Sequence, residues 1–301
     1  MDTERPSPRY GDIDLWDPGE ILDAMVEAQF AAIAAVHTAR GEIETAALAI
    51  AARLRDGGRL VYAGAGTSGR LAVQDGAELP PTFAWPPERL LLLIAGGDAA
   101  LLRAVEGAED DAAAAVALVS RHGIGAADVL VAVAASGSTP FTVAAVAAAR
   151  QQGALTVGIA NNRDAPLLRA AEHPIALVTG AEAIAGSTRM KAGTAQRAAL
   201  TLLSSLVMIR LGRVYRGLMV EVRAVNAKLA RRSEGILLQL TGRDIDAVRE
   251  ALGRAQGNVK LALLLLEGCP LKEAEALLAR AGGRLRDAKG LAGERRPRRR
   301  P

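Results

Sequence analysis

Between residues 59 and 178, short runs of apolar residues alternate with longer segments of helical character. Apolar runs bounded by glycine and turn residues are typical of strands that are buried on both faces of a sheet. Their alternation with helices predicts parallel strands joined by crossover helices, and therefore an α/β fold with a five-stranded parallel sheet flanked by helices. The expected strands are 59–63, 90–95, 129–135, 154–160 and a less apolar fifth run, 174–178. The expected intervening helices are 69–78, 101–121, 139–152 and 165–171.

The segments on either side of this alternating region are helical in character. Residues 1–57 are expected to form N-terminal helices that pack on a sheet domain spanning 58–240. Two long helical segments are expected between Gly186 and Arg232, at the end of that domain. Residues 241–292 are expected to form a small three-helix module, and residues 293–301 a basic, disordered tail. The three helices of the module are expected at 244–253, 258–267 and 271–281, with Asn258 as the N-cap of the second.

The total charge overstates how basic this chain is. Its formal net charge of +4 and pI of about 9.6 would suit a nucleic-acid partner. However, five arginines among the last seven residues account for more than the whole surplus. No apolar run approaches the roughly 18 residues of a membrane span, and residues 1–10 lack a signal-peptide core. We therefore expect a soluble cytoplasmic protein without a nucleic-acid or membrane partner.

Glycine- and hydroxyl-rich loops follow the first and third expected strands, at 64–70 and 135–140. Their hydroxyl side chains are Thr67, Ser68, Ser136, Ser138 and Thr139. Both loops lead directly into a helix, and ligands of open α/β sheets bind beyond the carboxyl ends of the strands. Free N–H groups at a helix N-terminus, with hydroxyls beside them, suit a phosphate. Each hydroxyl alone could be an ordinary helix cap, but two such loops on one sheet favour a phosphate site.

The first loop also fits the Gly-x-Gly-x-x-Gly fingerprint of dinucleotide-binding enzymes, so an oxidoreductase is an alternative. That fingerprint requires an acidic residue at the end of the second strand to hold the ribose. The candidate, Asp98, lies beyond two glycines and is too far along the chain from the first loop. The single Cys269 excludes a disulfide framework, and the three histidines (His37, His122 and His173) are too scattered to form a metal site.

Two carboxylates and one polar segment are further candidates for functional groups. Glu78 precedes Pro80 and Pro81 at the expected C-terminal end of a helix, where the helix dipole does not favour a carboxylate. Glu109 lies in an acidic cluster that follows the second strand. In the segment 180–197, Ser187 has the position of an ordinary N-cap, and Arg189 and Lys191 beside it would form a second anion site.

Five segments together resemble the N-acetylmuramic acid 6-phosphate etherase family, which has a sugar-isomerase (SIS) fold and is related to the glucokinase regulatory protein. The segments are Gly-Ala-Gly-Thr-Ser-Gly-Arg-Leu at 64–71, Ala-Glu-Leu-Pro-Pro-Thr-Phe at 77–83, Ile-Ala-Gly-Gly-Asp at 94–98, Ala-Val-Glu-Gly-Ala-Glu-Asp-Asp at 104–111 and Gly-Ser-Thr-Arg-Met-Lys-Ala-Gly-Thr-Ala-Gln at 186–196. The likeness continues through 218–220 and 226–229 into the terminal helices. It implies an SIS-type three-layer fold with a small C-terminal helical module.

The resemblance implies cleavage of the D-lactyl ether at C3 of a muramic sugar phosphate, without a metal or redox cofactor. Glu78 then takes the acid/base role at C3, and Glu109 is the base that removes the C2 proton. The phosphate is held by Ser68, Ser136 and Thr139, with Ser138 and Thr67 as further candidates. Arg189 and Lys191 are candidates for holding the lactyl carboxylate. Because SIS proteins commonly complete their sites across a dimer interface, the resemblance also implies a homodimer.

The chain departs from the family pattern at two places. Arg197 stands where the family usually has lysine, and Ala28-Gln29-Phe30 stands where an acidic pair is common. Neither change touches the two glutamates. A sugar-phosphate-sensing regulator without catalysis remains an alternative to the enzyme.

Overall fold

The computed structural model describes residues 1–222 and 227–295, and they form two compact units. The first unit contains Met1–Glu78 and Pro86–Val207. The second contains Leu79–Trp85 and the chain from Met208 onward. The last six residues of the predicted tail, 296–301, lie outside the described residues, whereas 293–295 end the last helix.

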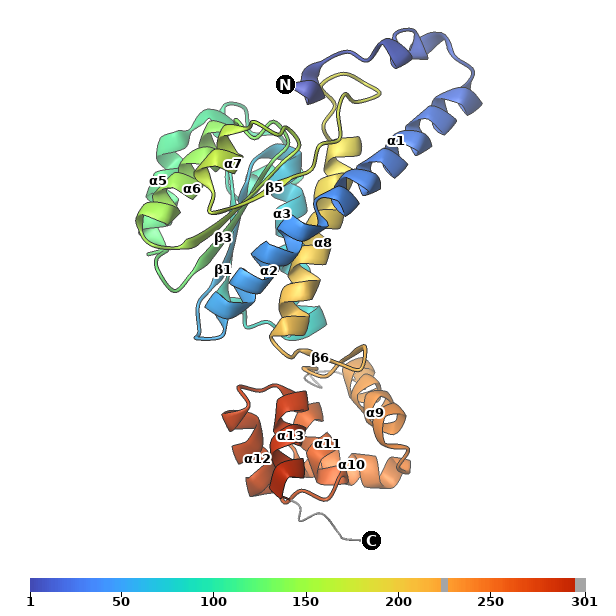
Figure 1. Cartoon of the computed structure of the whole chain (residues 1–301), viewed down its shortest axis with the longest axis vertical. Coiled ribbons are helices and arrows are strands. Elements are labelled where there is room, and N and C mark those ends of the chain that lie inside the picture. The colour runs from blue at the N-terminus through green and yellow to red at the C-terminus, as the bar shows by residue number, and fades with distance from the viewer. Residues whose placement is uncertain (223–226, 296–301) are drawn as a thin grey trace. The chain divides into compact units, whose positions relative to one another are not determined.

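The first unit is built on a five-stranded, fully parallel sheet in the order β2-β1-β3-β4-β5 (Figure 1). The strands are β1 (Leu60–Gly64), β2 (Leu90–Ile94), β3 (Val129–Ala134), β4 (Leu155–Ala160) and β5 (His173–Ala176). All residues of β1, β3 and β4 are buried. The apolar runs were therefore a sound guide to the sheet, and the predicted α/β fold is confirmed.

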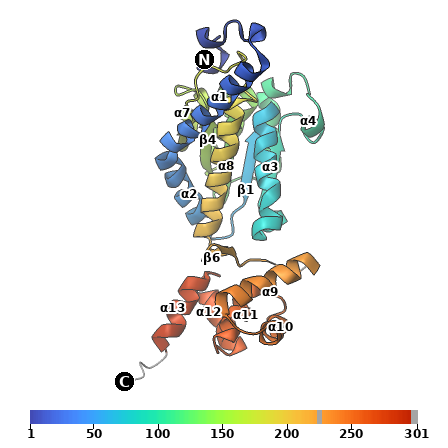
Figure 2. The ribbon, with the colours of Figure 1, turned by 90° about the vertical axis from the view of Figure 1, so that its right-hand side faces the viewer.

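Helices cover both faces of the sheet and complete three layers (Figures 1 and 2). One face carries α5 (Ala112–Arg121), α6 (Pro140–Gln151) and α7 (Pro166–Ala170), whose buried side chains join those of the strands in one core. The other side of the sheet carries four longer helices: α1 (Pro18–Thr38), α2 (Arg40–Leu54), α3 (Gly66–Phe83) and α8 (Lys191–Arg210). By length and composition α8 could cross a membrane, but 56% of its apolar window is buried, as in a core helix.

Several short elements precede α1 or lie in the connections between strands and helices. They are the 3₁₀ turns η1 (Asp2–Glu4), η2 (Pro8–Tyr10), η3 (Ile13–Leu15), η4 (Pro87–Arg89) and η5 (Ala108–Asp110), and the one-turn helix α4 (Ala99–Leu102). The predicted helix over 101–121 is therefore wrong in its first half. Only Ala112–Arg121 forms a regular helix, which begins where the Asp111 side chain accepts a hydrogen bond from the Ala114 N–H at 2.8 Å.

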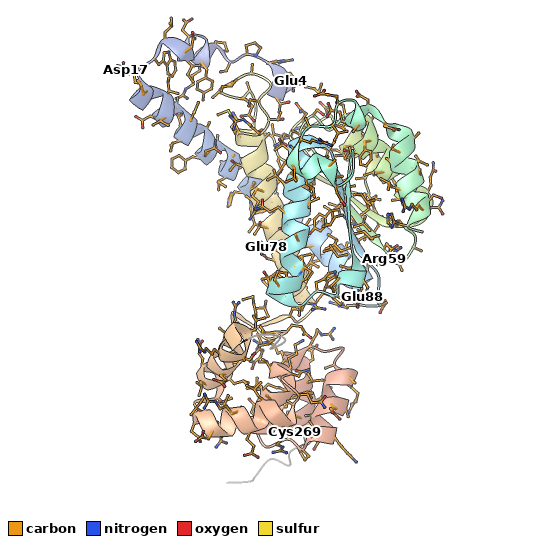
Figure 3. All side chains as sticks on the ribbon, turned by 180° about the vertical axis from the view of Figure 1, so that it is seen from behind. Glu4, Asp17, Arg59, Glu78, Glu88 and Cys269 are labelled. Carbon is orange, nitrogen blue, oxygen red and sulfur yellow. The ribbon has the colours of Figure 1, made fainter. Side chains whose placement is uncertain are left out.

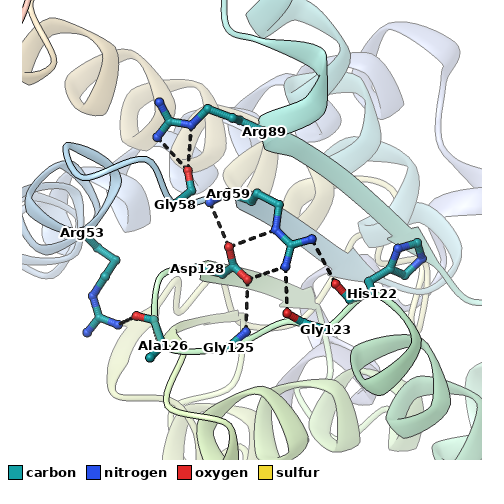
Figure 4. Close-up of polar contacts among 9 residues, drawn as sticks. All are labelled: Arg53, Gly58, Arg59, Arg89, His122, Gly123, Gly125, Ala126 and Asp128. Atoms are coloured by element: carbon teal, nitrogen blue, oxygen red, sulfur yellow. Dashed lines mark hydrogen bonds and ion pairs between the residues drawn. The ribbon is translucent and has the colours of Figure 1, made fainter.

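Polar contacts join the segments at the amino-terminal ends of the strands β1 and β3 (Figure 4). The Asp128 carboxylate accepts hydrogen bonds from the Arg59 side chain at 2.6 and 3.0 Å and from the Gly125 N–H at 3.1 Å. Burial by itself would raise the pKa of Asp128, but these hydrogen bonds outweigh it and lower the pKa. The same guanidinium donates to the carbonyls of His122 and Gly123, so one ion pair joins β1 to the chain before β3.

The second unit is helical and has its own core. Its helices are α9 (Ala227–Thr241), α10 (Ile245–Arg254), α11 (Val259–Leu266), α12 (Leu271–Arg280) and α13 (Leu285–Arg295). The three predicted short helices are present as α10 to α12, and Asn258 caps α11 as expected, 3.1 Å from the Leu261 N–H. A further helix, α13, follows them.

The prediction of two long helices up to Arg232 is wrong. After α8 the chain forms a two-stranded antiparallel hairpin, β6 (Val214–Tyr215) and β7 (Leu218–Met219), before α9 begins. Gly217 has a φ of +77° in the turn of this hairpin, a conformation that glycine adopts without strain. The four residues of the hairpin strands are too few to show an alternating pattern.

Candidate functional site

The two hydroxyl-rich loops lie side by side, because they follow β1 and β3, which are neighbours in the sheet. The first loop brings a strand and a helix into very close approach. A Cβ at Gly64 would lie 2.8 Å from the Gly69 Cα, so neither position tolerates a side chain. Ser68 is buried and is the third residue of α3, so it is not the N-cap of that helix. Its hydroxyl lies in the first helical turn, where free N–H groups favour an anion.

The second loop turns sharply at Gly137, whose φ is +67°. A Cβ there would lie 2.3 Å from the Ala165 Cβ, so the loop is packed tightly against the chain before α7. The Ser136 hydroxyl accepts a hydrogen bond from the Ser138 N–H at 3.2 Å. Thr139 occupies the N-cap position of α6 but makes no capping hydrogen bond with its side chain. The interpretation of this threonine as a simple helix cap is therefore wrong, and its hydroxyl is available to a ligand.

Two asparagines behind these loops were missed by sequence reasoning. Asn162 donates from Nδ2 to the carbonyls of Ala135, at 3.0 Å, and Ser136, at 3.4 Å. Asn161 accepts from the Gln196 amide at 2.8 Å and donates to the Leu177 carbonyl at 3.0 Å. Both are buried directly after β4. Two consecutive amide side chains at the end of a predicted buried strand were a signal that could have identified them.

The segment before α8 is organised by Glu182 rather than by Ser187. The buried Glu182 carboxylate accepts hydrogen bonds from the N–H groups of Lys191, at 3.0 Å, and Ala192, at 2.8 Å. It therefore caps α8 from nine residues upstream, and the expectation that Ser187 is the N-cap is wrong. Local sequence rules find caps that are adjacent to the helix, and Glu182 is not.

The two basic residues of this segment lie in different environments. Lys191 is 7% exposed, and its ammonium donates to the Ala181 carbonyl at 2.6 Å. Burial lowers the pKa of this lysine, although the nearby Glu182 carboxylate opposes the shift. Arg189 is exposed and lines a cavity of about 670 Å³ together with Thr67, Thr194 and Arg197. The structure thus brings Arg189 and Thr67 together, whereas Lys191 already has a protein partner.

The two glutamates lie at different places along the sheet. Glu78 is exposed and follows Ser68 by ten residues of α3, which is about 15 Å along the helix axis. Figure 3 shows it toward the end of the unit where Arg59 and Glu88 lie, with Glu4 at the opposite end. Glu109 is exposed in η5, directly before α5, and its neighbours Ala108 and Asp111 line a cavity of about 560 Å³. Within one chain, Glu78 therefore lies about three helical turns along α3 from Ser68 of the first loop.

The predicted end of the helix that carries Glu78 is wrong. α3 continues through Pro80 and Pro81 to Phe83. Proline lacks the N–H that an interior helical position donates, which is why the sequence predicts a stop at this point. Glu78 is therefore not the last residue of its helix but lies more than one turn before the end.

Comparison with known proteins identifies the family. A model of the N-terminal SIS domain of glucokinase regulatory protein matches residues 42–150, and a general SIS-domain model matches 101–206. An N-acetylmuramic acid 6-phosphate etherase from Deinococcus radiodurans is 51% identical over 96% of this chain and 95% of its own length. The chain belongs to the N-acetylmuramic acid 6-phosphate etherase family. Etherases from Streptomyces coelicolor, at 47% identity, and Mycolicibacterium smegmatis, at 42%, match 97% and 96% of this chain, and 94% and 98% of their own lengths.

Membership of the etherase family confirms the resemblance drawn from the motifs and the SIS-type fold. It also removes the oxidoreductase alternative, for which Asp98 was already poorly placed. The match to a glucokinase regulatory domain covers only part of the chain, whereas the etherases match nearly all of it. The regulator is therefore the less supported alternative.

Proposed function

We propose that this chain cleaves the D-lactyl ether of N-acetylmuramic acid 6-phosphate to give N-acetylglucosamine 6-phosphate and D-lactate. It is a carbon–oxygen lyase that acts in the recycling of cell-wall amino sugars. The observation that carries this proposal is the 51% identity to an etherase over 96% of the chain. The two hydroxyl loops on neighbouring strands, each at a helix N-terminus, support a sugar-phosphate ligand.

The phosphate of the substrate is held by Ser68, Ser136 and Thr139, with Ser138 and Thr67 as further donors. Hydroxyls and helix N–H groups suit a small anion because they donate several hydrogen bonds from fixed positions. The cavity that contains Thr67 and Arg189 supports Arg189 as a partner of the lactyl carboxylate. Lys191 contributes to that role only if its ammonium exchanges the Ala181 carbonyl for the substrate.

The chemistry is an elimination followed by the addition of water. In the ring-opened sugar the C1 aldehyde acidifies the C2 proton, which Glu109 removes. The C3–O bond breaks as the C2=C3 double bond forms, and the Glu78 carboxyl protonates the departing lactate oxygen. Glu78, now ionised, takes a proton from the water that adds to C3, and Glu109 returns a proton to C2. Both carboxyls then regain their starting protonation states.

The active protein is a homodimer in which a second copy of the chain brings its Glu78 to the phosphate loops of the first. In one chain Glu78 lies about 15 Å along α3 from Ser68, so we expect each site to combine the phosphate loops of one chain with Glu78 of the other. A row of exposed apolar side chains on α1 supports such a contact, because large exposed apolar patches mark interaction surfaces. These side chains are Leu22, Val26, Phe30 and Ile33, each at least half exposed. The homodimer acts in the cytoplasm.

The decisive test is incubation of the purified full chain with N-acetylmuramic acid 6-phosphate and measurement of D-lactate. Release of D-lactate and N-acetylglucosamine 6-phosphate in equal amounts is expected. If the sugar phosphate binds but no lactate appears at any pH, the enzyme proposal is wrong and the regulator is favoured. A matched incubation with unphosphorylated N-acetylmuramic acid tests whether the phosphate loops are used.

A further inference from the structure

The segment Met1–Glu4, which we call the clasp, lies against the loops of the candidate site. Figure 1 shows this end of the chain beside the segment that precedes α8. Thr3 is fully buried, at 0% exposure, whereas Glu4, Arg5 and Pro6 after it are exposed. A polar residue that is buried while the residues after it are exposed indicates a specific contact there.

Thr3 connects two loops of the site through two hydrogen bonds. Its hydroxyl accepts from Asn162 Nδ2 at 3.2 Å, and the same amide group donates to the carbonyls of Ala135 and Ser136. Its carbonyl accepts from the Gly186 N–H at 3.2 Å. Thr3 therefore ties the second phosphate loop to the loop that leads to Arg189.

The clasp also contacts Ser138, one of the proposed phosphate-binding residues. The Ser138 hydroxyl lies 3.7 Å from the Met1 sulfur, which is a weak acceptor. A phosphate oxygen is a much stronger acceptor, because it is charged. Ser138 can therefore exchange Met1 for a ligand, while the hydrogen bonds of Thr3, which involve Asn162 and Gly186 and not Ser138, persist.

We propose that Thr3 is a positioning residue for sugar-phosphate binding: through Asn162 it fixes the backbone of the Ser136–Thr139 loop, and through Gly186 it holds the neighbouring loop against it. This inference rests on the proposed function for the identity of the ligand. Thr3 itself does not touch the reacting atoms. Its loss weakens binding of the phosphate and leaves the bond-breaking steps intact.

The test compares Thr3→Val, which keeps the shape and removes the hydroxyl, with Thr3→Ser, which restores it. Thr45→Val is the matched control, because the Thr45 hydroxyl only bonds the Gly41 carbonyl within the exposed face of α2. The dissociation constant for N-acetylglucosamine 6-phosphate is measured by calorimetry, and KM and kcat by lactate release. We expect the dissociation constant and KM to rise about tenfold in Thr3→Val, as for the loss of one buried hydrogen bond, with kcat changed less than twofold. Thr3→Ser and Thr45→Val should bind like the wild type.

An unchanged dissociation constant in Thr3→Val overturns the proposal, and so does a fall in kcat without a change in binding. Hydrogen exchange of the wild-type chain gives a second test that does not depend on a variant folding. The Gly186 amide should exchange more slowly when N-acetylglucosamine 6-phosphate is bound, and equal exchange with and without ligand contradicts the clasp. Binding is measured with the product, so these results hold even if the wild type releases no lactate. Absent lactate release would contradict the enzyme proposal and not the role of Thr3.

Discussion

At the scale of single residues, the two glutamates are distinguished by which proton each one moves. Glu78→Gln cannot donate a proton to the lactate oxygen, so lactate release should fall by at least about a hundredfold, the usual contribution of a general acid. Glu109 is intact in this variant, so C2 should still exchange its proton with deuterated solvent. Glu109→Gln should lose both the exchange and lactate release. Proton NMR of the sugar in deuterated water measures both, and wild-type exchange in Glu109→Gln would show that another group is the C2 base.

A separate prediction for single residues concerns phosphate binding by the hydroxyls of the second loop. Ser136→Ala removes one donor to the phosphate and the acceptor of the Ser138 N–H. A hydrogen bond to a charged group contributes about 1.5–3 kcal/mol, so KM should rise by about one to two orders of magnitude with a smaller change in kcat. Ser120→Ala, in the exposed part of α5, is the control. If KM does not change in Ser136→Ala, the phosphate lies elsewhere.

Residue types near the loops could be predicted from the sequence, but the environment of each residue could not. The sequence predicts Ser68, Ser136 and Thr139 because glycine-rich turns after apolar runs have a known geometry. The place of Lys191 beside the expected cap Ser187 predicts an anion-binding role, yet this lysine is buried and donates to the Ala181 carbonyl. Its surroundings are set by Glu182, which lies nine residues earlier in the same segment and accepts from the Lys191 N–H. A contact of this kind depends on the fold, and no local pattern records it.

At the scale of elements, a buried polar cluster fixes α3 between β1 and α8. The Asp75 carboxylate accepts from the Tyr62 hydroxyl at 2.8 Å and from the Ser204 hydroxyl at 3.2 Å, and all three side chains are buried. Burial raises the pKa of Asp75, and the hydrogen bonds and the nearby Arg197 offset this only in part. The contribution of this carboxyl to stability is therefore complete below its unfolded pKa of about 3.9 and declines as the pH rises through its folded pKa.

This cluster predicts a pH-dependent effect of Tyr62→Phe. The variant removes a donor to the buried carboxylate, so the free energy of unfolding should fall by about 1–2 kcal/mol at pH 8. As the pH falls through the raised pKa of Asp75, the difference from the wild type should shrink, because a protonated Asp75 needs that donor less. Urea denaturation at a series of pH values measures the difference, with Tyr10→Phe, at a partly exposed site, as the control. A larger difference at lower pH would contradict the assignment.

Helices and strands could be predicted where they are long enough to show several repeats of their apolar pattern. The five strands and the helices α6, α10, α11 and α12 follow from apolar runs and turn residues, because each is long enough to show its repeat. The hairpin of β6 and β7 has two residues in each strand and shows none. The continuation of α3 through Pro80 and Pro81 breaks a rule that holds for most helices, and so the sequence placed its end too early.

At the scale of the whole molecule, the separation of Glu78 from the phosphate loops makes a prediction about mixed dimers. The number of chains in the active protein has no signature in composition or periodicity, so it must be tested directly. If each site combines Glu78 of one chain with Ser136 of another, a dimer of one Glu78→Gln chain and one Ser136→Ala chain has one intact site and one doubly altered site. If both residues come from the same chain, every site in that dimer carries one change.

Mixing the two variants after reversible dissociation therefore separates the two arrangements. Random reassociation makes half of the dimers mixed, and one of their two sites is intact, so about a quarter of the wild-type activity should return. The measurement is the rate of D-lactate release before and after mixing, at a substrate concentration too low to rescue Ser136→Ala. A mixture of two Glu78→Gln preparations carrying different tags is the control and should stay inactive. Activity that stays at the average of the separate variants would place Glu78 and the phosphate loops of one chain in the same site.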